Sequence, residues 1–233
     1  MDNYQQIYTG AGIESRVSRV MKRVYLNMTL GLVFTGLIAW FCGNSYDYIM
    51  WIAQHSWAVW AMFIAQFAIV IGVSAGLNRL STATATLLFF VFAALMGASL
   101  APIFVVYTQT TIAKTFFITA GVFGAMSIYG YSTDRDLSRV GSFLVMALLG
   151  LIIASVVNLF VASSTFDWII SIVGVLIFVG LTAWDTQQIK QLAIMAPDDT
   201  VMHLAVLGSL NLYLDFINLF LYLLRIFGGN NND

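Results

Sequence analysis

Seven long apolar stretches dominate this sequence, and each has about the length that a helix needs to cross a bilayer, roughly 17–25 residues. They lie at residues 24–42, 57–77, 82–106, 112–131, 140–162, 168–184 and 204–227. The stretches are continuous and do not alternate with period two, as the strands of a membrane barrel would. The sequence therefore predicts an all-α integral membrane protein with seven transmembrane helices. We expect a basic N-terminal tail (1–23), a membrane domain (24–227) and a short C-terminal tail (228–233).

The composition excludes several classes of soluble protein. The chain of 233 residues is 60% hydrophobic and 9% charged, whereas an ordinary soluble domain carries about 25% charged residues. A net charge of −1 offers no basic surface for nucleic acid. The single cysteine, Cys42, excludes an internal disulfide and a cysteine-based zinc cluster. We expect a lipid bilayer around most of the chain and no bound cofactor, except calcium in transit.

Basic residues concentrate on one side of the predicted helices. Eight of the ten lie in the N-terminal tail and in alternate loops: Arg16, Arg19, Lys22, Arg23, Arg79, Arg135, Arg139 and Lys190. Because Lys and Arg are retained on the cytoplasmic side of a membrane, we expect a cytoplasmic N-terminus. Tryptophan favours the membrane interface, and all six lie near span ends: Trp40, Trp51, Trp57, Trp60, Trp168 and Trp184.

Two acidic residues lie in or beside apolar stretches rather than in loops or tails. Asp185 is at the inner end of the sixth stretch, and Asp215 is near the middle of the seventh. A carboxylate near the bilayer centre costs about 2.5–3.5 kcal/mol on insertion scales, so it needs a partner, a cavity or a proton. The two carboxyl groups can meet if the seventh helix tilts. Alternatively, Asp185 is an interfacial residue bonded at a helix end, and Asp215 is a polar tie to a neighbouring helix.

A close pair of carboxyl groups would respond to pH. Two like charges about 4 Å apart repel by roughly 4 kcal/mol at an effective dielectric of about 20, so the pair would titrate as a unit. The pair could also bind calcium, with further oxygens from Asn211, Asn218, Thr186 or Gln187. Arg79 lies just after the second stretch, on the same side. It could turn toward the carboxylates, or it could serve as an ordinary cytoplasmic anchor.

Two segments of the C-terminal third carry a recognisable pattern. Trp184-Asp185-Thr186-Gln187 is like a Tyr-Asp-Thr-Gln element with tryptophan in place of tyrosine, and residues 210–228 read LNLYLDFINLFLYLLRIFG. Both segments resemble the Bax inhibitor-1 family, also called the transmembrane Bax-inhibitor-motif family, and the resemblance covers essentially the whole chain. It implies a seventh helix surrounded by the other six. It also implies that Asp185 and Asp215 form a pH-sensitive latch on a calcium leak, with Arg79 as the arginine that pairs with the latch.

These features predict a pH-sensitive calcium leak in a bacterial inner membrane. The alternative is a non-conducting regulator, and the resemblance implies a membrane-bound AAA protease as a partner. Intramembrane aspartyl proteases also place aspartates on a sixth and a seventh helix. Their second aspartate follows Gly-x-Gly, however, where this chain has Tyr213-Leu214, and their Pro-Ala-Leu element is absent from this sequence. We therefore expect no enzymatic activity.

Overall fold

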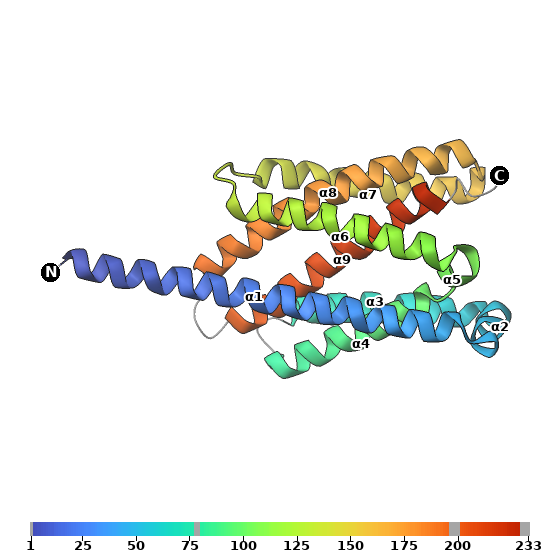
Figure 1. The fold of residues 1–233 in the computed structure, drawn as a ribbon, viewed down its shortest axis with the longest axis horizontal. Coiled ribbons are helices and arrows are strands. Elements are labelled where there is room, and N and C mark those ends of the chain that lie inside the picture. The colour runs from blue at the N-terminus through green and yellow to red at the C-terminus, as the bar shows by residue number, and fades with distance from the viewer. Residues whose placement is uncertain (1, 77–79, 196–200, 229–233) are drawn as a thin grey trace. The chain divides into compact units, whose positions relative to one another are not determined.

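The computed structural model describes residues 2–76, 80–195 and 201–228, with side chains from residue 12 onward. In these ranges all regular elements are α-helices (Figure 1). They are α1 (Asp2–Gly43), α2 (Tyr46–Gln54), α3 (Ser56–Ala75), α4 (Thr82–Leu100), α5 (Ile103–Val106), α6 (Gln109–Ser132), α7 (Ser138–Val161), α8 (Ser164–Met195) and α9 (Val201–Gly228). Seven helical segments are long and apolar enough to cross a membrane, which confirms the predicted fold class.

Two helices are longer than the apolar stretches that predicted them. α1 continues through the basic segment before residue 24, and α8 runs on to Met195. Hydropathy falls where a helix leaves the lipid, whereas backbone hydrogen bonding continues through polar residues with good helix propensity. The alternative in which Asp185 is bonded at a helix end is therefore wrong, because ten further residues of α8 follow it.

Side chains and prolines set the other helix boundaries. The hydroxyl groups of Ser45, Ser81 and Thr108 each accept a hydrogen bond from a backbone N–H in the first turn of the following helix. Pro102 separates α4 from the short α5, because a proline ring clashes with the preceding helical turn. Ala162 ends α7 with a left-handed backbone conformation, φ 51°.

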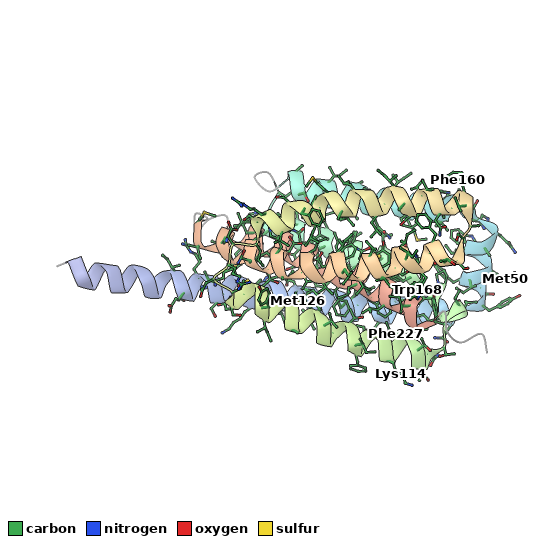
Figure 2. All side chains as sticks on the ribbon, turned by 90° about the horizontal axis from the view of Figure 1, so that it is seen from above. Met50, Lys114, Met126, Phe160, Trp168 and Phe227 are labelled. Carbon is green, nitrogen blue, oxygen red and sulfur yellow. The ribbon has the colours of Figure 1, made fainter. Side chains whose placement is uncertain are left out.

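Many large apolar side chains are exposed on the surface of the helices, which suits a lipid environment. Phe160 and Trp168 project from α7 and α8 (Figure 2), and Phe160 is 87% exposed. Extensive exposed apolar surface of this kind is unfavourable in water and is what a helix presents to lipid. The indole of Trp184, in contrast, packs directly against Gly141 of α7.

The helices form two compact units along the chain. The first unit comprises Met1–Val106 and Ile189–Tyr213. Its core contains Tyr213, which is fully buried and lies edge-on to the rings of Phe89 and Phe92 at 5.7 Å. The Thr35 hydroxyl donates to the Ala93 carbonyl at 2.8 Å and lies 2.6 Å from the Tyr213 hydroxyl, which therefore donates to it. A satisfied polar chain thus ties α9 to α1 and α4.

The second unit comprises Tyr107–Gln188 and Leu214–Asp233, and it contains both predicted gating aspartates. Phe216 of α9 packs against the rings of Phe116 and Phe123 of α6. Gly130 of α6 lies against the backbone of Ala183 in α8. Small residues at such contacts let helix backbones approach closely.

The seventh spanning helix, α9, contributes Val201–Tyr213 to the first unit and Leu214–Gly228 to the second. In its most apolar segment 67% of the residues are buried, compared with 11–44% in the corresponding segments of the other six spans. This burial supports an internal position for α9. That the other six helices surround it stays a prediction.

Candidate functional site

The structure brings Asp185 of α8 and Asp215 of α9 together. Their carboxyl groups lie close enough to interact directly with each other. Asp215 is only 4% exposed, and Asp185 is half-buried. Ionised carboxylates only accept hydrogen bonds, so a bond between two carboxyl groups requires a proton on one of them. A proton on either carboxyl group would therefore allow the pair to form such a bond.

The register between α8 and α9 explains why these two residues meet. Seven residues before Asp185 is Phe178, and seven residues after Asp215 is Tyr222. The rings of Phe178 and Tyr222 are stacked, with centroids 5.9 Å apart and an interplanar angle of 26°. Equal steps in opposite directions thus reach a second contact, so the helices run antiparallel here. Gly174 leaves room for the Tyr222 ring, which a Cβ at that position would meet at 2.7 Å.

The segment of α8 around Asp185 is held from outside as well. The Gln187 side chain accepts a hydrogen bond from the backbone N–H of Leu137 at 2.9 Å and donates one to the carbonyl of Arg135 at 2.8 Å. Trp184 packs on Gly141 of α7. These contacts fix the position of α8 along its own axis and its rotation about that axis near the aspartate pair.

The oxygen atoms near the pair determine whether it could hold calcium, which takes six to eight oxygen ligands. Gln187 was a predicted ligand, but the loop before α7 uses both ends of its amide. Asn218 donates to the Leu214 carbonyl of its own helix at 2.8 Å. Thr186 Oγ1 and Asp215 Oδ2 are buried without a hydrogen-bond partner among the described residues. Two carboxyl groups and a neighbouring hydroxyl fit a cation in transit better than a tightly bound one.

Across residues 2–76, 80–195 and 201–228, no three His, Cys, Asp or Glu residues gather in a way that could hold a metal ion. Arg79 lies outside the described residues, so its pairing with the aspartates stays a prediction.

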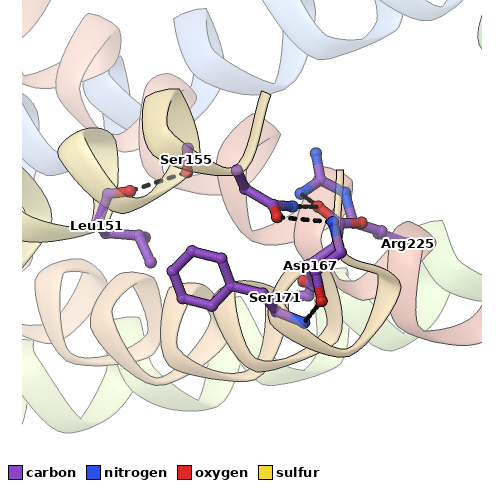
Figure 3. A network of polar contacts seen from close by, with 8 residues as sticks. Leu151, Ser155, Asp167, Ser171 and Arg225 are labelled. Carbon is purple, nitrogen blue, oxygen red and sulfur yellow. Dashed lines mark hydrogen bonds and ion pairs between the residues drawn. The ribbon is translucent and has the colours of Figure 1, made fainter. Parts of the chain in front are cut away.

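Sequence reasoning missed a second polar cluster, drawn in Figure 3. Arg225, in the last turn of α9, forms an ion pair with Asp167, in the first turn of α8, at 3.1 Å. The Asn158 amide of α7 also reaches Asp167, at 3.5 Å. The predicted sixth stretch began at residue 168 and so left Asp167 in a loop. The available signal was an acidic residue at the start of one helix and a basic residue at the end of the next, because these ends meet when the helices are antiparallel.

Comparison with known proteins agrees with this architecture. A family model described as inhibitor of apoptosis-promoting Bax1 matches residues 17–232, which include both aspartates and all the helices from α2 onward. The chain belongs to the Bax inhibitor-1 family. The resemblance seen in the two C-terminal motifs is therefore confirmed.

Bax inhibitor-1 relatives in distant bacteria match nearly end to end. Inner membrane protein YbhL of Escherichia coli (strain K12) is 46% identical over 212 residues, covering 90% of this chain and 91% of that protein. An uncharacterized protein of Borreliella burgdorferi is 46% identical over 218 residues, covering 93% and 94%. Uncharacterized protein RP147 of Rickettsia prowazekii is 46% identical over 216 residues, covering 92% and 91%.

Proposed function

We propose that this Bax inhibitor-1 family protein is a pH-sensitive cation leak of a bacterial inner membrane, with calcium as its cargo. The location is that of the Escherichia coli relative, which is named as an inner membrane protein. The observation that carries the proposal is the close approach of the carboxyl groups of Asp185 and Asp215, two acids on spanning helices. Such residues are costly in a membrane and usually serve ion or proton pathways.

The number of protons on the pair decides whether α8 and α9 are joined. While the two carboxyl groups share a proton, their hydrogen bond joins α8 to α9. Loss of that proton leaves two like charges that repel by roughly 4 kcal/mol at about 4 Å and an effective dielectric of about 20. That energy shifts an equilibrium by about a thousandfold. The joined state is therefore present at lower pH and is lost as the pH rises, and the separated carboxylates attract cations.

The test is calcium flux into liposomes that contain the purified protein, measured from pH 5.5 to 8.5. We expect the leak of the wild type to change with pH and to rise toward the alkaline end. In D215N and D185N an amide replaces one acid and cannot lose its proton in this range, so the pH dependence should disappear. D136N is the control, because Asp136 lies in the loop before α7, outside the pair. Equal leaks from wild type and D215N at every pH would refute gating by the pair.

The direction in which the leak changes with pH tests the predicted role of Arg79 in the gate. Protonation would weaken a bond between the pair and Arg79, so a path closed by that bond would open in acid. A leak that rises in acid and loses this rise in R79Q would assign closure to the arginine bond. A leak that rises in alkali in both proteins would assign closure to the carboxyl–carboxyl bond.

A non-conducting regulator is the second candidate. The observation that favours it is the length of α1, whose 42 residues would extend about 63 Å, twice the thickness of a hydrocarbon core. A helix that leaves the membrane can present a surface to a protein such as a membrane-bound AAA protease. A protease partner that co-purifies with D185N/D215N as well as with the wild type, together with liposomes that never leak, would favour this function.

A further inference from the structure

The polar residues of α8 and α9 continue beyond the aspartate pair along one seam. On α9 the spacing of Asp215, Asn218, Tyr222 and Arg225 alternates between three and four residues, so these side chains share one helix face. We define the α8–α9 seam by these four residues together with three residues of α8: Asp167, Phe178 and Asp185. Three contacts cross it, namely the carboxyl pair, the Phe178–Tyr222 stack and the Asp167–Arg225 ion pair.

The two ends of the seam are one membrane thickness apart along α8. Asp167 and Asp185 are separated by 18 residues, or about 27 Å of helix, compared with about 30 Å for a hydrocarbon core. The seam therefore has a carboxylate at each end, and the two are far enough apart along α8 to cover most of a hydrocarbon core. The Asp185 carboxyl group faces a second acid, whereas the Asp167 carboxylate binds a cation.

Arg225 is held at the Asp167 end by two groups, a carboxylate and an aromatic ring. Its Nη1 donates to Asp167 Oδ1 at 3.1 Å, and its guanidinium carbon lies 5.7 Å from the centroid of the Tyr222 ring. The Asn158 amide binds the same Asp167 oxygen (Figure 3). The Asp167 carboxylate and the Tyr222 face together form a place for a cation, and the side chain of Arg225 fills it.

The contribution of this ion pair to folding stability is too small to explain why it is present. The side chains of Arg225 and Asp167 are 44% and 42% exposed, and such pairs contribute about 0–1 kcal/mol. We infer that Arg225 is a tethered cation that occupies the Asp167 end of the seam, so that a mobile cation must displace it to pass. This inference rests on the proposed leak and makes Arg225 a residue that determines its cation specificity.

Replacing each partner of the ion pair in turn distinguishes a role in ion passage from a purely structural role. R225Q removes the tethered cation and leaves Asp167 free to attract ions, so the calcium leak should rise. D167N leaves an uncompensated guanidinium at the same place, so the leak should fall. A unit charge about 7 Å away in water changes the local concentration of a divalent ion by about eightfold and of a monovalent ion by about threefold. Calcium flux should thus change more than potassium flux.

The flux experiment uses the full chain in liposomes at the pH where the wild type leaks fastest. K114Q is the matched control, because it removes one positive charge from an exposed position on α6, outside the seam. Opposite changes in R225Q and D167N, with K114Q unchanged, support the inference. Changes in the same direction would show that the ion pair only fastens two helix ends, and would overturn it.

Terbium binding tests the role of Arg225 even if neither the wild type nor any variant conducts calcium. Trp168 follows Asp167 in the chain and can sensitise the luminescence of a bound terbium ion. Detergent-solubilised R225Q should gain terbium emission that the wild type lacks, and D167N/R225Q and W168F/R225Q should lose it. No gain in R225Q would overturn the inference. A gain without any leak from wild type, D215N or R225Q would refute the proposed channel while supporting Arg225 as the occupant of a cation site.

Discussion

At the residue scale, the absence of a side chain decides how close α6 comes to α8. Gly130 of α6 lies directly against the carbonyl group of Ala183, two residues before Asp185. A Cβ atom there would meet backbone, which cannot rotate away as a long side chain can. Gly121 of the same helix is different, because an added Cβ would meet nothing within 4 Å.

We therefore expect G130A to destabilise the protein by about 1–3 kcal/mol, as overpacking of a close contact does. G121A should be neutral or stabilising by up to about 1 kcal/mol, because alanine favours a helix more than glycine does. Thermal unfolding of both variants in the same detergent measures the difference. Equal melting temperatures for the two variants would show that α6 and α8 do not touch at Gly130.

At the element scale, a side chain of α8 organises the loop that precedes α7. Leu137, the residue before α7, has no side-chain cap of its own, and Gln187 accepts a hydrogen bond from its backbone N–H. Asp136 accepts a hydrogen bond from the backbone N–H of Ser138 at 2.9 Å. Hydrogen bonds from Ser138 lower the pKa of Asp136 below its ordinary value. This local stabilisation is present above the ordinary pKa and is lost as the pH falls through the lowered value.

Removal of the Gln187 amide should loosen this loop. Q187A leaves the Leu137 N–H and the Arg135 carbonyl without their partner, at a cost of about 1–3 kcal/mol for the buried group. Hydrogen–deuterium exchange over residues 133–141 should accelerate. Q188A is the control, since Gln188 is the next residue and only half-buried. Unchanged exchange in Q187A would show that the loop holds its shape without α8.

At the scale of the whole molecule, seven crossings would place the two chain ends on opposite sides of the membrane. The seven spanning segments begin at Gly12 and end at Gly228. The distribution of Lys and Arg predicts which end is cytoplasmic, since most of the basic residues precede or follow the spans on one side.

Reporter fusions check this topology. A fluorescent protein that folds only in the cytoplasm should be active at the N-terminus, and alkaline phosphatase, which needs an oxidising compartment, should be active after residue 228. Activity of one reporter type at both ends would contradict seven spans. The reverse assignment at both ends would keep the spans and refute the predicted orientation.

Hydropathy alone determined the fold class and the seven spans, because the cost of placing backbone and side chains in lipid is a local property of each stretch. The cost of a charge in lipid likewise singled out Asp215. The packing of Trp184, the position of Asp185 inside a long helix, and the use of Gln187 were decided by tertiary structure. So was the meeting of Asp167 with Arg225. Each depends on the register between helices, and register follows from steric contacts, such as Gly174 against Tyr222, between residues far apart in the chain.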